Sequence, residues 1–383
     1  MSDGVEGGLS SRRVVHYIDS EVFGGSEEAA LHLMSSLDRG RWDPILLHHP
    51  DAGVARLVEQ AARLGIPTRS APRVHPRHRL AGLITLRRSL RAERAMIFHA
   101  HLSWPFACKH GVRAAWLARV PGIVGTAQLY VAPDDTTWSR VILSPFRRII
   151  AVSGEVQARY IQDLNFPASK LTVVRNAITL PPRGRTGNVA LRAELVAGRP
   201  DYVILTPARL HPQKGHEYLL AAITQVPDAT FVLAGDGPLR LELEARAREL
   251  GIADRCLFLG ERSDVQDLLA AADLFLLPSL FEGLPVSILE AMAAERPVVA
   301  TAIGGTDEVV TSEQTGLLVP PRDPVAIAAA IRRLRAEPAL ARTLASAGRE
   351  RVELEFSADV AAGRVMRIYD EVFAEVGGSV GNG

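Results

Sequence analysis

The sequence predicts an α/β protein made of two doubly wound domains that face each other across a cleft. Its 383 residues are enough for two domains of ordinary size. Short runs rich in valine, isoleucine and leucine alternate with longer stretches of helical period, which is typical of βαβ units and a parallel sheet. The alternation stops at residues 179–188, which are rich in proline, glycine and arginine, and then begins again. Ligands of such folds bind beyond the carboxyl ends of the strands, so the cleft is the expected site.

The first half holds five apolar runs of strand length, separated by stretches in which apolar residues recur at helical spacing. Continuous apolar character indicates strands that are covered on both faces. We therefore expect strands at 14–19, 43–49, 96–101, 122–127 and 148–153, and helices at 25–37, 54–65, 80–93 and 105–118.

The second half repeats this order and then becomes helical from residue 324 to 376, with no further strand. We expect domains at 1–180 and 181–360, and from 361 a carboxyl-terminal helix that returns to the first domain. The Gly/Ser-rich ends, 1–11 and 377–383, are expected to be disordered. The expected strands are 201–208, 229–236, 256–261, 273–279 and 296–302, and the helices include 217–223, 238–250 and 285–295.

Composition excludes several classes of function. A net charge of +1 gives no reason to expect nucleic acid as a partner. Cys108 and Cys256 lie far apart and have no CxxC partner, so neither a disulfide framework nor a zinc site is indicated. No run reaches the roughly 18 apolar residues of a membrane span. We expect a cytoplasmic protein, and contact with the inner face of the membrane stays open.

Two glutamates stand out in FEGLPVSILEAMAAERPVVAT, residues 281–301. The stretch reads as a turn followed by a helix in which Pro285 takes the first helical position. Gly283, followed by Leu284, leaves the backbone open to a ligand, and free N–H groups at a helix amino end suit a diphosphate. Glu282 and Glu290 are acceptor-only groups that suit sugar hydroxyls. The alternative is that Glu282 is a solvated turn residue and Glu290 a charge favoured by the helix dipole.

This ExxxxxxxE pattern, followed by GGTDEVV at Gly304–Val310, resembles the donor-binding signature of the family-four retaining glycosyltransferases, also described as glycosyl transferases group 1. The resemblance implies the GT-B fold, with two Rossmann-like domains. It also implies that Glu282 meets hydroxyls of the transferred sugar and that Glu290 meets the ribose of the nucleotide. It covers residues 207–318 well and the first half only loosely.

Two cations follow the strand predicted at 201–208. Arg209 and Lys214 lie between that strand and the next helix, and either alone could be a solvated charge. Together they suit the α- and β-phosphates of a leaving nucleoside diphosphate, and the family resemblance implies the same role. No two aspartates are spaced as DxD, so we expect the fixed cations, without a metal ion, to stabilise the diphosphate.

Glycines and histidines mark the strand ends of the first half. Gly24 and Gly25 form either an ordinary strand-to-helix turn or a bare loop that approaches the donor phosphate, as the resemblance implies. His99 and His101 end a strand, where a packing role is the alternative to catalysis. The resemblance places His101 near the reacting sugar and leaves His99 behind it. Asn176 matches a family position for which we expect a structural role.

The nucleobase is expected against residues 260–265, where Arg262 and Ser263 could contact it. A second glycine-rich stretch, GDGPLR at 235–240, lacks the third glycine of a dinucleotide fingerprint and has no acidic ribose partner at the expected distance. Nicotinamide binding is therefore not expected.

The sequence thus predicts a retaining, metal-independent hexosyltransferase with no cofactor beyond the nucleotide-sugar donor. A sugar-nucleotide epimerase, a phosphorylase and a non-catalytic nucleotide-sugar-binding partner are the alternatives. The acceptor is a small molecule, a lipid-linked sugar or a saccharide, and the sugar, the base and the oligomeric state stay open. The basic segment at 73–79 is either a solvated loop or a receiver of an anionic acceptor or a phospholipid surface.

Overall fold

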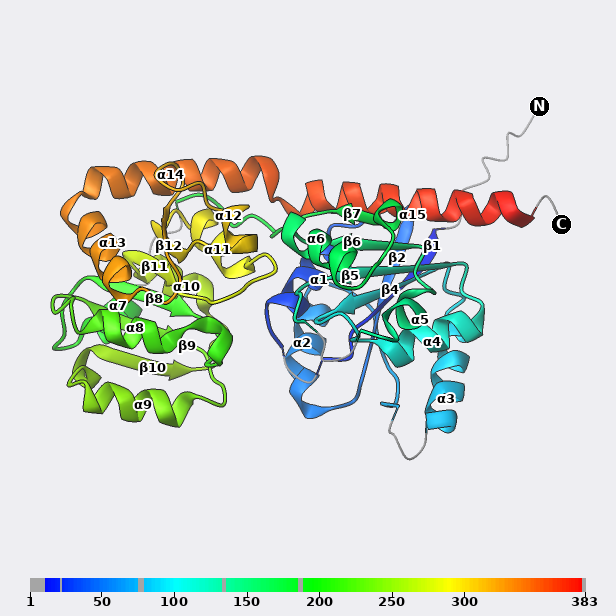
Figure 1. Cartoon of the computed structure of the whole chain (residues 1–383), viewed down its shortest axis with the longest axis horizontal. Coiled ribbons are helices and arrows are strands. Elements are labelled where there is room, and N and C mark those ends of the chain that lie inside the picture. The colour runs from blue at the N-terminus through cyan, green and yellow to red at the C-terminus, as the bar shows by residue number, and fades with distance from the viewer. Residues whose placement is uncertain (1–10, 21–22, 75–78, 133–135, 185–188, 381–383) are drawn as a thin grey trace, which may run out of the picture. The chain divides into compact units, whose positions relative to one another are not determined.

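The computed structural model describes residues 11–20, 23–74, 79–132, 136–184 and 189–380. The chain divides into two compact units (Figure 1). The first unit holds residues 1–175 together with 358–383, and the second holds 176–357. Each unit has one parallel sheet with its own core, so the prediction of two parallel-sheet α/β domains is confirmed.

The sheet of the first unit has seven parallel strands in the order β3-β2-β1-β4-β5-β6-β7. The five predicted strands are all present, within a few residues of the expected ends. β3 and β7 were not predicted, because three residues carry too little periodicity to be recognised. The strands are β1 (Arg12–Tyr17), β2 (Trp42–His48), β3 (Thr68–Ser70), β4 (Ile97–Leu102), β5 (Gly122–Ala127), β6 (Arg148–Ala151) and β7 (Leu171–Val173).

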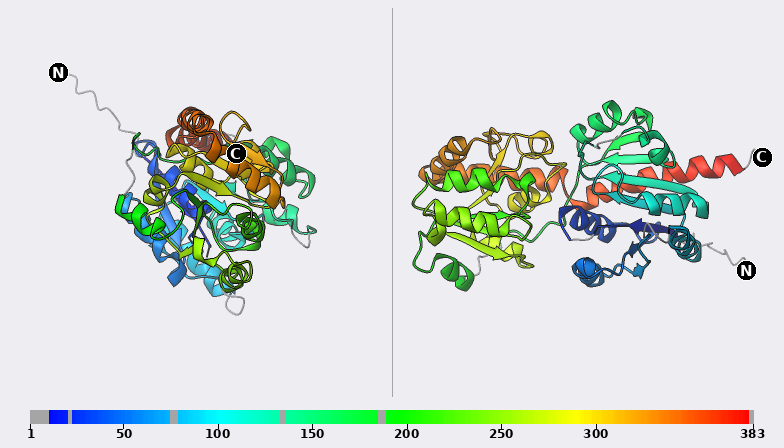
Figure 2. Two further views of the ribbon diagram at one scale, coloured as in Figure 1. Left: turned by 90° about the vertical axis from the view of Figure 1, so that its left-hand side faces the viewer. Right: turned by 60° about the horizontal axis from the view of Figure 1, so that its bottom comes forward.

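Helices cover both faces of this sheet (Figure 1, Figure 2). Right-handed crossovers place α1 and α2 on one face, because the chain moves from β1 to β3 in one direction. From β3 to β7 it moves in the other direction, which places α3 to α6 together on the opposite face. The helices are α1 (Gly25–Ser35), α2 (Ala55–Arg63), α3 (Arg79–Ala92), α4 (Lys109–Ala118), α5 (Ser139–Leu143) and α6 (Gly154–Gln162).

The last helix, α15 (Ala358–Val380), completes the first unit. It packs beside α1, and its apolar residues form one core cluster with Val14, Trp42 and Ile97 of the sheet. The ring of Trp42 meets the ring of Tyr369 edge to face, with centroids 5.4 Å apart. The core of the first unit therefore depends on residues from both ends of the chain.

The second unit has six parallel strands in the order β10-β9-β8-β11-β12-β13. Its five predicted strands are present. The sixth, β13, was missed for the same reason as the other three-residue strands. The strands are β8 (Val203–Pro207), β9 (Thr230–Ala234), β10 (Cys256–Gly260), β11 (Leu274–Leu277), β12 (Val298–Thr301) and β13 (Leu317–Val319).

The helices of the second unit are short, apart from two near its end. None of the helices in the described part of the chain combines the length and the apolar character that crossing a bilayer requires. They are α7 (Val189–Val196), α8 (His216–Ile223), α9 (Arg240–Glu249), α10 (Val265–Ala271), α11 (Val286–Ala293), α12 (Gly304–Asp307), α13 (Pro324–Ala336) and α14 (Pro338–Glu355).

The observed boundaries differ from the predicted ones for local reasons. The units divide after Arg175 and Ser357, rather than after 180 and 360. The residues that follow Arg175 form hydrogen bonds with the second unit. The Asn176 side-chain amide donates to the carbonyl oxygen of Leu284, and the Ile178 N–H donates to the carbonyl oxygen of Phe356. The tail expected from 377 is wrong in part, since α15 continues through Val380.

Candidate functional site

The predicted donor residues lie at the point of the second sheet where the strand order reverses. From β8 the chain winds outward to β10, and from β11 it winds the other way, so β8 and β11 are neighbours that lead in opposite directions. Loops that leave two such strands separate and open a crevice beyond the sheet, where α/β proteins bind ligands. Arg209 and Lys214 follow β8, and Glu282 and Gly283 follow β11.

The loop after β8 presents two cations. Arg209 is exposed, and no acid in the described ranges forms an ion pair with it. Lys214 ends a short 3-10 turn and is followed by Gly215, whose φ is +63°. A Cβ on Gly215 would lie 2.2 Å from the carbonyl oxygen of Pro278, so only glycine lets this loop pack against the one after β11.

Glu282 joins the two loops. Its carboxylate forms an ion pair with Lys214 and accepts a hydrogen bond of 2.6 Å from the Ser279 hydroxyl. The amide of Gln213 lies 3.4 Å from its second oxygen. Only 7% of the Glu282 side chain is exposed, so the solvated-turn alternative does not describe it. Separating a charged pair that is this sheltered from water costs free energy, unless a ligand offers each charge an equivalent partner.

The helix that follows has an open amino end. Pro285 is the N-cap of α11 and not its first helical residue, and no side chain among the described residues caps it. A Cβ on Gly305, in α12, would lie 1.8 Å from the Gly283 carbonyl oxygen, so α12 closes directly against this turn. Free N–H groups and the helix dipole at such an end favour an anion. Beside them, the buried hydroxyl of Thr306 has no hydrogen-bond partner.

Glu290 lies further along α11 and is buried. It accepts a hydrogen bond of 3.1 Å from Gln266 of α10, and so it faces the helix that follows the predicted base-binding loop. In that loop Arg262 forms a two-fold ion pair with Asp264, which raises the arginine pKa, and Ser263 is exposed. The carboxylate and the loop therefore lie on adjoining elements, as the predicted ribose and base contacts require.

Sequence reasoning missed several polar groups around this cluster. Gln213 and Ser279 are ordinary loop residues that only the fold brings to Glu282. His216 is buried with both ring nitrogens unpartnered, and burial, followed by the charge of Lys214, lowers its pKa to about 4. The pKa of His211 is also lowered, first by burial and then by Arg209 and Lys214. In both histidines burial is the larger cause, and the neighbouring cations add to it.

The glycine pair of the first unit lies at the start of α1, between the end of β1 and the helix. Gly24 is the N-cap of α1, and its N–H donates to the buried carboxylate of Glu27 at 2.9 Å. Ser26 donates to the same oxygen. The Glu27 carboxylate therefore caps the amino end of α1 in this structure, and a role of Gly24 and Gly25 in binding the donor phosphate stays a prediction. Gly25 opens the helix.

His101 belongs to a cluster of three buried histidines on one face of the first sheet. His16 and His99 are paired in register on β1 and β4, and His101 lies two residues further along. His16 Nδ1 and His101 Nε2 share a hydrogen bond of 2.9 Å, while His99 bonds to Tyr369 and Thr126. The remaining nitrogens of His16 and His101 have no hydrogen-bond partner among the described residues. The rings of His99 and His101 stack with centroids 4.6 Å apart, and sequence analysis missed His16.

This cluster is the one group of three potential metal ligands in the described part of the chain, with its ligand atoms within 4.8 Å of one another. Both ring nitrogens of His99 already have hydrogen-bond partners. A metal ion would have to displace Tyr369 or Thr126, so the arrangement fits hydrogen bonding better than metal binding.

We expect acid to destabilise the protein through these histidines. Burial lowers the pKa of all three, that of His101 to about 3, so they are neutral in the folded chain and become protonated near pH 6.5 when it unfolds. The stabilisation is therefore present above pH 6.5 and is lost as the pH falls below it, because the unfolded chain then binds protons that the buried histidines do not. Thermal unfolding at pH 7.5 and 5.5 measures this, and His101→Gln should reduce the slope. Equal melting temperatures would contradict it.

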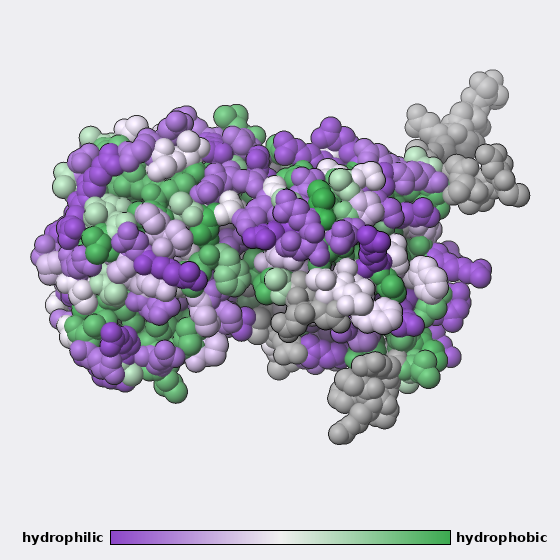
Figure 3. All heavy atoms as spheres, viewed as in Figure 1, coloured by the Kyte–Doolittle hydropathy of each residue, from purple (hydrophilic) through white to green (hydrophobic). Residues whose placement is uncertain are grey.

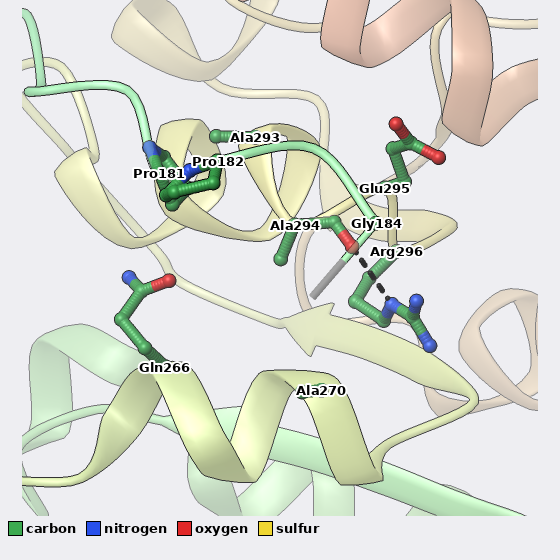
Figure 4. A pocket seen from close by; sticks show the side chains of 9 residues that line it. All are labelled: Pro181, Pro182, Gly184, Gln266, Ala270, Ala293, Ala294, Glu295 and Arg296. Carbon is green, nitrogen blue, oxygen red and sulfur yellow. Dashed lines mark hydrogen bonds between the residues drawn. The ribbon is translucent and has the colours of Figure 1, made fainter. Parts of the chain in front are cut away.

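One small pocket lies elsewhere on the second unit. It has a volume of about 40 Å³ and lies between the start of α10, the end of α11 and residues 181–184 (Figure 4). Ligand pockets are roughly 300–1,000 Å³, so a nucleotide cannot enter it. Figure 4 shows the Arg296 guanidinium held against the Ala294 carbonyl at its edge. Gln266, the hydrogen-bond partner of Glu290, lines this pocket, whereas none of the predicted site residues does.

Two family models match the chain. The one described as Glycosyltransferase Family 4 matches residues 23–180, and the one described as Glycosyl transferases group 1 matches residues 201–337. The chain is 30% identical over 261 residues to the UDP-Gal:alpha-D-GlcNAc-diphosphoundecaprenol alpha-1,3-galactosyltransferase of Escherichia coli, covering 63% of this chain and 66% of that one. It is 33% identical over 173 residues to the 2-deoxystreptamine glucosyltransferase of Streptomyces kanamyceticus, covering 44% and 45%.

The chain thus spans between about half and two thirds of the length of the curated relatives it matches. Among solved structures, HepE of Anabaena in complex with UDP and glucose matches with a TM-score of 0.81 at 22% identity, over 94% of this chain and 100% of that chain. This likeness confirms the predicted GT-B fold.

Proposed function

Since the chain belongs to the family 4, group 1 glycosyltransferases, we propose that it transfers a hexose from a nucleoside-diphosphate sugar to an acceptor hydroxyl with the anomeric configuration retained and without a metal ion or other cofactor. The observation that carries the proposal is the Lys214–Glu282 ion pair at the strand-order reversal, beside the open end of α11 and Arg209, which pairs with no acid in the described part of the chain. These groups offer positive charge for a diphosphate and an acceptor for sugar hydroxyls within one loop pair.

The bound donor would replace the ion pair between Lys214 and Glu282 by contacts of each residue with the donor. Lys214 turns from Glu282 to the diphosphate, which Arg209 and the N–H groups of α11 also bind. Glu282 then accepts from hydroxyls of the sugar. Glu290, near the loop of Arg262 and Ser263, accepts from the ribose. We favour uridine as the base, because a relative and a structural neighbour are named with UDP.

Transfer then needs positioning more than a protein nucleophile. The bond from the anomeric carbon to the phosphate oxygen breaks while the bond to the acceptor oxygen forms on the same face. The acceptor proton passes to the leaving phosphate oxygen, so charge and atoms balance. Arg209 and Lys214 stabilise the charge that develops on that oxygen. His101, neutral because burial lowers its pKa, lies at the strand end of the unit that would receive the acceptor.

The acceptor class follows from neither unit alone. The relatives act, by name, on a diphosphoundecaprenol-linked sugar in one case and on 2-deoxystreptamine in another. We favour a lipid-linked or saccharide acceptor, because the longer of these two matches is to the enzyme of the lipid-linked sugar. Buried Cys108 and Cys256 are both free thiols, which fits a reducing cytoplasm, where we place the protein.

A thermal-shift screen of nucleoside diphosphates and their sugars tests the donor site. At a hundred times the dissociation constant the ligand should add about 2.7 kcal/mol of stability. Transfer should then proceed unchanged in EDTA, and an absolute requirement for added manganese would contradict metal independence. Product formed from the donor alone, without an acceptor, would point to an epimerase. Binding without turnover across acceptors would favour the non-catalytic alternative.

A further inference from the structure

One layer of the first unit carries an unusual set of exposed side chains. The chain has four tryptophans, and only Trp42 is buried, whereas Trp104, Trp116 and Trp138 are 43%, 60% and 63% exposed. Single exposed apolar side chains are common, and it is a contiguous apolar patch that marks an interaction surface. Trp104 lies in the loop before α4, Trp116 lies in α4, and Trp138 is the N-cap of α5, all on the sheet face opposite α1 and α15.

Two neighbouring helices of this layer each show an outward stripe made of apolar and basic residues. On α4 the exposed positions Lys109, Arg113, Trp116 and Leu117 recur at helical spacing. On α3, which packs against α4, Leu80 is 78% exposed and is followed along the same stripe by Ile84, Arg88 and Arg91. Figure 3 shows hydrophobic side chains at the surface over α3. Neither stripe contains an acid.

The third helix of the layer continues the pattern. Trp138 precedes α5, and exposed Arg140 and Val141 follow within it. We call the exposed residues of these three helices the basic apolar face; its members are Leu80, Ile84, Arg88, Arg91, Lys109, Arg113, Trp116, Leu117, Trp138, Arg140 and Val141.

The stretch of chain that carries this face is rich in cations. From Leu80 to Arg147 the sequence holds nine Lys and Arg against three Asp and Glu, a net charge of +6, while the whole chain carries only +1. Of the three acids, Glu93 is paired with Arg13 and Arg69, and the other two lie outside the described residues. Lys109, Arg113 and Arg88 form no ion pair with any acid that the structure describes.

We propose that the basic apolar face docks the protein onto an anionic phospholipid bilayer. Tryptophans settle at the boundary between head groups and acyl chains, aliphatic side chains enter the acyl region, and Lys and Arg meet the anionic head groups. Nucleic acid would pair with the cations and stack on the tryptophans but would leave Leu80, Ile84, Leu117 and Val141 without a partner. Docking is a property of the first unit, and it does not depend on the proposed transfer reaction.

Tryptophan fluorescence of the full chain tests this directly, because three of its four emitters lie on the face or beside it. Vesicles of phosphatidylcholine with about 30% phosphatidylglycerol should shift the emission to shorter wavelength and carry the protein into the pellet. Vesicles of phosphatidylcholine alone should do neither, and about 0.5 M salt should weaken binding roughly tenfold or more. Acyl chains brominated near the head group should quench the emission.

Paired variants separate the two contributions. Lys109→Gln with Arg113→Gln should weaken vesicle binding by about fivefold for each charge. Trp116→Ser with Leu117→Ser should abolish quenching at that site while the melting temperature stays the same. The matched control is Leu241→Ser with Arg248→Gln, an exposed apolar and basic pair on α9 of the second unit.

Three results would overturn the proposal. One is no binding by the native chain to anionic vesicles, and another is equal binding to neutral ones. The third is an emission shift that grows with protein concentration in the absence of vesicles, which would assign the face to a second copy of the chain. A failure of sugar transfer with normal vesicle binding would count only against the proposed enzyme activity.

Discussion

Replacement of Glu282 by glutamine is expected to lower the turnover number about a hundredfold or more while the nucleoside diphosphate binds at least as tightly. The carboxylate is sheltered and is held by Lys214 and Ser279. Glutamine keeps the shape but offers a weaker, neutral acceptor to the sugar hydroxyls. It also releases Lys214 from its counter-ion, so the ammonium meets the phosphate without first breaking an ion pair.

Initial rates and calorimetric titration with UDP measure the two effects separately. Glu242→Gln, an exposed acid on α9, is the matched control and should change neither. If Glu282→Gln kept the native rate, the residue would have to be removed from the site. If rate and diphosphate affinity fell together, Glu282 would be a structural support for the loop and not a sugar contact.

The second large effect is expected from the two cations. Arg209→Gln and Lys214→Gln should each weaken diphosphate binding roughly 10- to 100-fold, because each removes a charge-assisted hydrogen bond from a partly dehydrated site. Arg209 should give the cleaner loss, since it forms no ion pair within the described residues. Lys214→Gln also leaves the Glu282 carboxylate without its counter-ion, so the melting temperature should fall as well.

A double-mutant cycle tests the coupling. Lys214→Gln combined with Glu282→Gln should recover part of the stability that Lys214→Gln loses, because no buried charge is then unpaired. Arg248→Gln, an exposed cation remote from these loops in the sequence, should leave diphosphate binding within about twofold of native. Additive losses in the cycle would contradict this coupling, and full diphosphate affinity in Arg209→Gln would place the diphosphate elsewhere.

The sequence was sufficient for the parts of this molecule that local patterns encode. Strands of four or more residues, the glycines of tight turns and the position of Arg209, Lys214 and Glu282 after strands all follow from short-range periodicity and turn chemistry. The three-residue strands β3, β7 and β13 escaped because so short a run has no measurable period. Helix α4 begins at Lys109 and not near 105, because Cys108 takes a left-handed conformation with its N–H bonded to Asp19.

Contacts between distant segments were not visible in advance. Lys214 and Glu282 are 68 positions apart, and their pairing depends on β8 and β11 becoming neighbours. His99 and His101 share a strand and were found, but His16 joins them only through the register of β1 against β4. The hydrogen bond from Gly24 to Glu27 depends on the direction of the Glu27 side chain, which the sequence does not give. Contacts of these kinds can be identified only once the fold is known.

The return of α15 to the first unit decides the order in which the chain can mature. The strands of the first sheet precede the second unit in the chain, whereas α15, whose Tyr369 contacts His99 and Trp42, follows it and is therefore synthesised later. The second unit, encoded as one uninterrupted stretch, can close first. The first unit therefore stays incomplete while the second is synthesised, and loss of α15 would expose the core of a sheet whose strands lie far earlier in the chain.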